Sequence, residues 1–105
     1  MEKSEQPYYQ EFQEVAGILR QIRSKIYPET DFLWAGFVDH NEFLAELNAD
    51  IQKLESCDIA TLKKIHVEFL PTCTYQEIAI SNGWSNEYME LADKFDALWK
   101  RITMN

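Results

Sequence analysis

The first long segment of the chain spaces its apolar side chains alternately three and four residues apart. These residues are Tyr8, Phe12, Val15, Leu19, Ile22 and Ile26. An α-helix turns by about 100° per residue, so this spacing places all of these side chains on one narrow stripe. A half-buried strand would need a period of two. The pattern therefore predicts a helix over residues 8–26, with Pro7 at its start and Pro28 just beyond its end.

Capping and stop residues divide the middle of the chain into two further helices. Asp39 and Asp58 each precede an apolar-periodic run, where a short carboxylate can accept hydrogen bonds from free backbone N–H groups. Glu42, three residues after Asp39, strengthens the first of these signals. Pro71 ends the second run because proline has no backbone N–H.

Two more helices follow. Thr74 and Glu77 have the spacing of a capping box, Gly83 is the expected left-handed stop, and Ser85 is placed to cap the last helix. We therefore predict an all-α fold, a compact orthogonal bundle of about five helices over residues 8–26, 40–56, 59–68, 75–82 and 86–103. On the last helix, Glu90 with Lys94 and Asp96 with Lys100 have the spacing of favourable ion pairs.

Composition limits the classes of function. With 105 residues, 46% of them apolar, the chain has enough material for one core, and we expect a flexible N-terminus over 1–7 and a single helical domain over 8–105. The net charge of −8 repels nucleic acid phosphates and anionic membranes and favours a basic protein partner. No segment is apolar enough for a signal core or a membrane span, so we expect a cytoplasmic protein.

The residues that could carry chemistry are few and have no motif spacing. His40 and His66 lie far apart in sequence, and Cys57 and Cys73 form no CxxC motif. We therefore predict no metal site, no cofactor, no catalytic residue and no enzymatic activity. A Cys–His pair formed in space, for example with His66, remains an alternative.

The second predicted helix carries an acidic strip. Asp39, Glu42, Glu46 and Asp50 recur at spacings of three, four and four residues, which places them on a strip about 80° wide. Like charges at these spacings repel each other. An exposed acidic ridge of this kind would steer a basic partner and raise its association rate.

An aromatic connection precedes this helix. It contains Phe32, Trp34 and Phe37, and aromatic anchors flanked by carboxylates are typical of protein interfaces. Between Glu29 and Asp58 the chain has eight acidic residues and a single Lys. The alternative is that the rings belong to the core and that the ridge is only solvated. We predict a partner-binding surface made by Asp39, Glu42, Glu46, Asp50, Phe32, Trp34 and Phe37.

Residues 74–89, TYQEIAISNGWSNEYM, resemble a helix-turn-helix. Ala79 precedes Gly83 at the turn by four residues, and Ile78 and Met89 stand where that motif packs its two helices together. The resemblance implies a regulator that binds DNA or a transcription component. The second helix would, however, expose Asn86, Glu87, Glu90 and Asp93, and its carboxylates would repel phosphates. We therefore expect a tight helical corner and consider nucleic acid binding the weaker alternative.

The size, acidity, helical content and C-terminal stretch PTCTYQEIAISNGWSNEYMELADKF are similar to those of small acidic immunity proteins, which bacteria make against toxins. The resemblance implies a non-enzymatic inhibitor that occludes the active cleft of a basic toxin. This is our leading hypothesis, with the acidic ridge as the docking surface. The oligomeric state is left open.

Overall fold

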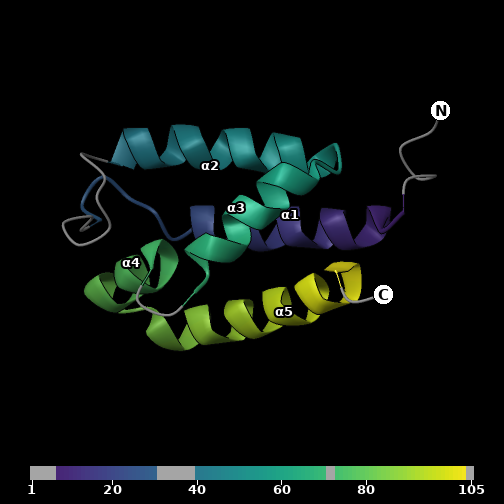
Figure 1. The fold of residues 1–105 in the computed structure, drawn as a ribbon. Coiled ribbons are helices and arrows are strands. Elements are labelled where there is room, and N and C mark those ends of the chain that lie inside the picture. The colour runs from purple at the N-terminus through teal and green to yellow at the C-terminus, as the bar shows by residue number, and fades with distance from the viewer. Residues whose placement is uncertain (1–6, 31–39, 71–72, 104–105) are drawn as a thin grey trace.

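The computed structural model describes residues 7–30, 40–70 and 73–103. These ranges contain five α-helices and no strand, which confirms the predicted all-α fold (Figure 1). None of the helices in the described ranges combines the length and the apolar character needed to cross a bilayer. The helices are α1 (Tyr9–Arg23), α2 (His40–Glu55), α3 (Ile59–Glu68), α4 (Thr74–Asn82) and α5 (Ser85–Thr103).

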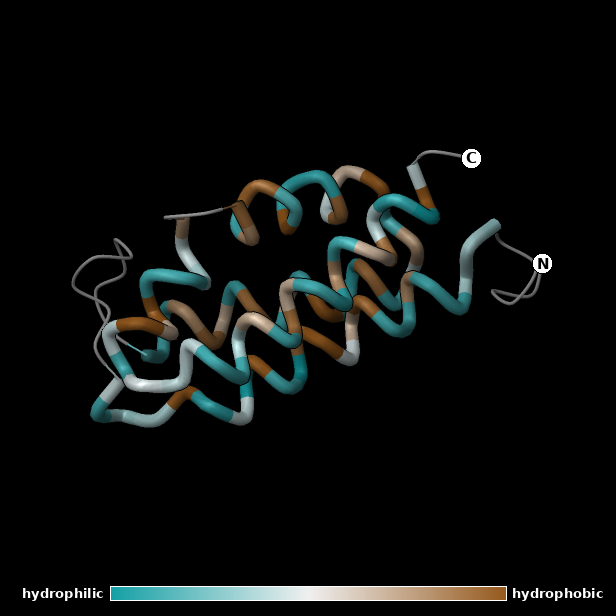
Figure 2. Tube along the Cα trace, turned by 90° about the horizontal axis from the view of Figure 1, so that it is seen from below, coloured by the Kyte–Doolittle hydropathy of each residue, from teal (hydrophilic) through white to brown (hydrophobic). Residues whose placement is uncertain are grey.

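Helix α1 lies between α2 and α5 and contacts both (Figure 1). The three helices run side by side along the long axis of a body that measures 42 × 23 × 19 Å. Helix α3 follows α2 through a short turn and crosses the layer obliquely, while α4 packs against α5. Figure 2, seen from below, shows α3 on one side of this layer and hydrophobic residues recurring along every helix.

The apolar stripe of α1 forms the centre of the core. Phe12, Val15, Leu19 and Ile22 are at most 3% exposed. The helix ends at Arg23, three residues before the predicted end, because the next turn is tighter: the N–H groups of residues 25 and 26 bond to carbonyls only three residues back. The stripe is nevertheless buried from Phe12 to Ile26, and Tyr8 at its start is partly buried.

The predicted caps are partly confirmed. The Asp58 side chain accepts hydrogen bonds from the Ala60 N–H at 3.1 Å and the Thr61 hydroxyl at 2.9 Å, so it caps α3 as expected. The predicted cap Asp39 lies outside the described residues, and the predictions for Thr74 and Ser85 are wrong by one residue, because both lie inside the first turns of their helices. Residue 73 occupies the N-cap position of α4, but its side chain forms no capping hydrogen bond.

Aromatic side chains join α3 to α5. The His66 ring stacks on Trp99 with centroids 3.9 Å apart, and the Phe69 ring stacks on Phe95 at 4.4 Å. Aromatic pairs in such contacts add about 0.5–1.5 kcal/mol beyond the burial of their area. This stack holds one side of α3, which leaves its other side to α2.

Replacing Gly17 and Gly83 by alanine is expected to change the free energy of unfolding in opposite directions. Gly17 lies in the middle of α1, and a Cβ there would meet no atom within 4 Å. Gly17→Ala should therefore raise the free energy of unfolding by about 0.5–1 kcal/mol, because it restricts the unfolded chain and improves helix propensity.

Gly83 ends α4 with a φ of +81°, a conformation that disfavours a Cβ. Gly83→Ala should lower the free energy of unfolding by about 1 kcal/mol. Urea denaturation followed by circular dichroism at low protein concentration measures both changes. The same sign for both variants would contradict this account of the two backbone positions.

Candidate protein-binding surface

Four of the seven residues predicted to bind a partner, Phe32, Trp34, Phe37 and Asp39, lie outside the described residues. Their exposure and contacts therefore remain predictions. The other three, Glu42, Glu46 and Asp50, lie on α2.

The acidic strip of α2 turns gradually from solvent toward α3. Glu42 is exposed in the first turn of the helix, and the Glu46 side chain is 41% exposed. Asp50, two turns beyond Glu42, has a side chain only 4% exposed. The expectation of an unpaired ridge in water is therefore wrong for Asp50, which is buried, and for Glu46, which is paired.

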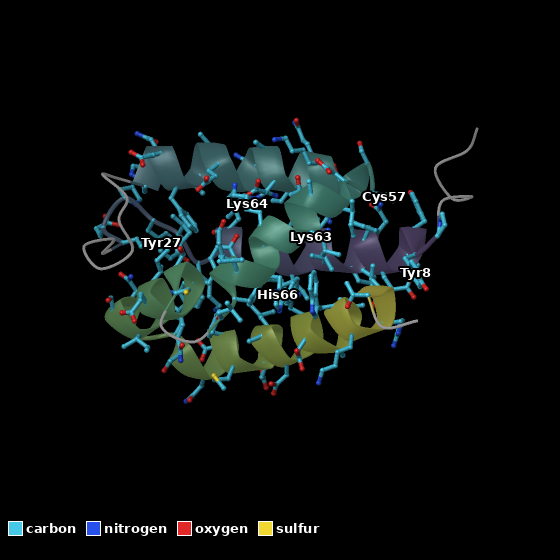
Figure 3. The ribbon with its side chains drawn as sticks, in the orientation of Figure 1. Tyr8, Tyr27, Cys57, Lys63, Lys64 and His66 are labelled. Carbon is cyan, nitrogen blue, oxygen red and sulfur yellow. The ribbon has the colours of Figure 1, made fainter. Side chains whose placement is uncertain are left out.

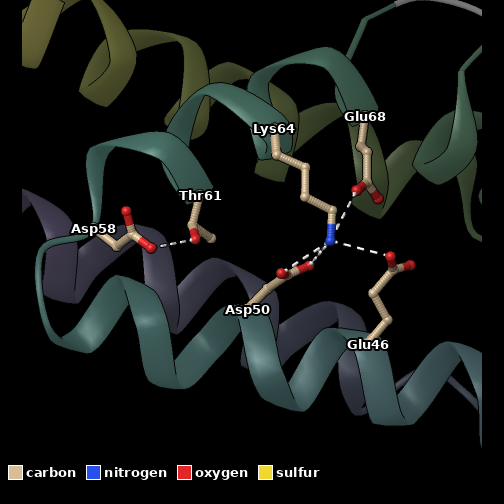
Figure 4. Close-up of polar contacts among 6 residues, drawn as sticks. All are labelled: Glu46, Asp50, Asp58, Thr61, Lys64 and Glu68. Carbon is tan, nitrogen blue, oxygen red and sulfur yellow. Dashed lines mark hydrogen bonds and ion pairs between the residues drawn. The ribbon is translucent and has the colours of Figure 1, made fainter.

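Both carboxylates bind the same lysine of α3. The Lys64 ammonium donates to both Asp50 oxygens at 3.0 Å and to Oε1 of Glu46 at 3.1 Å. It also lies 4.0 Å from Oε1 of Glu68 (Figure 4). We call these four residues the Lys64 cluster. It contains three carboxylates and one ammonium, so it has a net negative charge even after its internal pairing.

The turn between α2 and α3 assembles the cluster. The chain reverses at Cys57, which has a φ of +61°, and the Asp58 N–H bonds back to the Lys53 carbonyl at 3.1 Å. In such a hairpin, residues equally far from the turn face each other. Asp50 and Lys64 are each seven residues from Cys57. Counting outward from this turn would have found the pair, whereas the periodicity of α2 alone does not include α3.

Glu68 is the carboxylate that Lys64 neutralises least. Burial raises the pKa of Glu68 to about 7, and although the Lys64 ammonium opposes this shift, Glu46 and Asp50 reinforce it. Burial also raises the pKa of Asp50 above its usual value, against the hydrogen bond from Lys64. Near neutral pH, therefore, Glu68 is protonated in part of the molecules and ionised in the rest.

Tyr75 of α4 completes this region from inside. Its side chain is 1% exposed, it shares a hydrogen bond with Glu68, and burial raises its pKa well above the usual value. Its ring forms T-shaped contacts with Phe43 and Phe69, with ring centroids 6.2 Å and 4.9 Å apart. Sequence reasoning missed Glu68 and Tyr75. The signal for Tyr75 was its position one turn before the buried Ile78.

The structure places most of the residues that were considered for metal or thiol chemistry. Within residues 7–30, 40–70 and 73–103, no group of three or more His, Cys, Asp or Glu side chains is placed to hold a metal ion. His66 packs against the aromatic residues of α5. Cys57 and Cys73 are not in a disulfide and are of intermediate burial (Figure 3 labels Cys57 and His66).

The corner between α4 and α5 differs from its expected packing. Ile78 is 1% exposed, as predicted, but Met89 is 50% exposed and Tyr88 is buried in its place. The expectation that Met89 packs the two helices together is therefore wrong by one residue. The outer face of α5 exposes the predicted residues Asn86, Glu87, Glu90 and Asp93.

No protein-family model matches this chain, and no curated protein or solved structure is significantly similar to it. Function is therefore inferred from the charges, burial and contacts of the described residues.

Glu68→Gln should change the pH dependence of stability. The pKa of Glu68 is higher in the folded chain than in the unfolded chain, so its stabilising contribution is fully present below about pH 4.5 and is lost as pH rises through about 7. The variant should be more stable than the wild type at pH 8 by about 2–3 kcal/mol, with a smaller or reversed difference at pH 5.

Urea denaturation at pH 5, 6, 7 and 8 would measure this difference. Glu90→Gln on the exposed face of α5 is the matched control, because it removes the same charge without touching the cluster. A difference between Glu68→Gln and wild type that stays constant with pH would show that Glu68 does not titrate in this range.

Proposed function

We propose that this chain is a non-enzymatic protein that binds a basic protein partner, in the manner of an immunity protein or antitoxin that occludes a toxin's active cleft. The observation that carries the proposal is the surplus of carboxylates over cations where α2 meets α3. Lys64 is shared by three carboxylates, and Glu46 remains 41% exposed beside it.

The surplus negative charge makes this surface suited to a cationic partner. A partner lysine or arginine placed beside Glu42 and Glu46 would add the positive charge that the Lys64 cluster lacks. Exposed acidic surfaces of this kind raise the association rate with basic partners, and the effect weakens as salt rises. Asp50 is too deeply buried to touch a partner and instead holds Lys64 in place.

The aromatic residues Phe32, Trp34 and Phe37 and the carboxylate of Asp39 belong to the proposed surface through their position in the sequence directly before α2. Rings of this type supply most of the binding energy in many interfaces, while surrounding charges supply rate and specificity. The proposed division of labour is therefore an acidic edge on α2 that attracts the partner and an adjoining aromatic segment that anchors it.

The helix-turn-helix corner supports a second candidate, a regulator that binds DNA or a transcription component. Gly83 forms a left-handed turn between α4 and α5, as such a corner requires. Glu87, Glu90 and Asp93 face solvent on the helix that would approach the phosphates. This charge disfavours DNA.

Reversing two charges on α2 tests the proposal. Glu42→Lys combined with Glu46→Lys should abolish capture of basic proteins from a soluble extract of cells that make the chain, or weaken it at least about tenfold. The fold should persist, because Glu46→Lys leaves two carboxylates of the cluster facing two ammonium groups. Immobilised wild-type and variant proteins would be compared at several salt concentrations, and thermal unfolding would check the fold.

Glu90→Lys combined with Asp93→Lys is the matched control, since it makes the same charge change on the exposed face of α5. The proposal expects this control to capture the same proteins as the wild type. Equal capture by the α2 variant would refute the α2 surface, and loss of capture by the α5 variant alone would favour the helix-turn-helix corner. A mobility shift with duplex DNA at low salt would identify the DNA-binding form of that alternative.

A further inference from the structure

A hollow of about 410 Å³ lies between α1 and α5. Ile18 and Leu98, which are at most 6% exposed, lie at its base. Glu14 and Gln21 line it from α1, and Lys94, Ala97 and Arg101 line it from α5, together with Gly17. We call this hollow the α1–α5 groove. Its α1 side carries an acid and its α5 side carries two bases, so the two sides have opposite charge.

Two ion pairs, one from α1 and one from Lys25 just beyond its end, define the register of this segment against α5. Glu11 lies 3.7 Å from Arg101, and Lys25 lies 3.7 Å from Glu87. The two helices run in opposite directions (Figure 1), and both pairs correspond to the same antiparallel register. In that register Glu14 is level with Leu98, and Lys94 and Arg101 lie about one turn to either side of that level.

Two of the three charged side chains that line the groove, Glu14 and Lys94, make no polar contact within the described chain. The side chains of Glu14 and Lys94 form no hydrogen bond or ion pair with another described residue. Lys94 lines the groove, and the predicted pair with Glu90 is not formed, whereas the equivalent pair of Lys100 with Asp96 is formed at 3.0 Å. Arg101 remains 56% exposed although it reaches Glu11.

Small residues line the same groove. A mid-helix glycine costs about 0.5–1 kcal/mol relative to alanine, and no contact inside the described chain requires Gly17 to lack a Cβ. Ala97, on the facing helix, is also small and exposed. Small residues at these positions permit another helix to approach the α1–α5 face closely.

We propose that the α1–α5 groove binds a second copy of this chain across a two-fold axis that runs along the groove. This axis places α1 of one copy over α5 of the other. A rotation about it does not shift residues along the groove, so equivalent residues of the two copies lie at the same height. Glu14 of each copy then lies between Lys94 and Arg101 of the other copy. The contact is self-complementary, as an isologous two-fold interface must be.

The size of the surface and the overall charge make this a weak dimer. Helix α5 is about 28 Å long, and two adjacent helices offer a face about 20 Å wide, so each copy contributes less than the roughly 800 Å² of a standard interface. Two chains of net charge −8 also repel each other at long range. At about 0.15 M salt the Debye length is about 8 Å, which screens this repulsion more than the contact pairs.

Sedimentation of the wild type between about 10 µM and 1 mM protein at this salt concentration tests the proposal. The wild type should show a monomer–dimer equilibrium. Glu14→Lys and Lys94→Glu should each raise the dissociation constant about tenfold or more, because each places like charges against each other. A mixture of the two variants should form a heterodimer, since the charge reversal on α1 of one chain then faces the opposite reversal on α5 of the other.

Two further variants separate the interface from general effects. Lys100→Glu makes the same charge change outside the groove and should leave the equilibrium unchanged. A Cβ at Gly17 would meet no atom of the described chain within 4 Å, so Gly17→Leu should fold, and its side chain would block the approach of the second copy and leave the variant monomeric.

A wild type that is monomeric over the whole concentration range would overturn the proposal and leave the groove to a segment of a different protein. A dimer that Glu14→Lys and Lys94→Glu do not weaken would overturn it as well. So would a mixture of these two variants that stays monomeric.

Discussion

The burial of one stripe of α1 against two neighbours determines the rest of this structure. Leu19 and Ile22 are 0% exposed, and α1 contacts both α2 and α5. Polar contacts at the edges of the stripe set the register that apolar packing leaves free. Arg20 pairs with Glu55 of α2, while Lys25 pairs with Glu87 of α5. Because α1 positions both neighbours, α3 only has to cover the side of this layer that they leave open.

The contact between α2 and α3 buries carboxylates at a cost in free energy. A buried carboxylate such as Asp50 is tolerated only because Lys64 lies against it, since an unpaired buried charge costs several kcal/mol. The cost is largest at Glu68, where burial, reinforced by the charges of Glu46 and Asp50, raises the pKa to about 7 against the opposing effect of Lys64. Lys53 adds only a weaker attraction to Asp50, so negative charge is left at an exposed edge of α2, where it is available to a partner.

The sequence was sufficient to predict which segments are helical, because periodicity and caps act within a single helix. Residues 59–68 match α3, and Asp58 caps it as predicted. Predictions that depend on a second helix were less accurate. The period of α2 places Glu46 and Asp50 on one strip, but whether that strip faces water depends on α3. Likewise the spacing around Met89 resembles a packing position, yet the crossing of α4 over α5 buries Tyr88 instead.

Two groups of charged residues have different surroundings. On α2 and α3, Glu46, Asp50 and Glu68 share one cation. In the α1–α5 groove, Glu14 and Lys94 have opposite signs but are not paired with each other. The two surfaces have no residue in common, so occupation of one leaves the other available. A two-fold dimer through the groove would carry two acidic α2 edges, and two linked sites bind a partner with two basic surfaces more tightly than either site alone. Weak self-association would then increase the apparent affinity for such a partner without any new contact at the acidic edge.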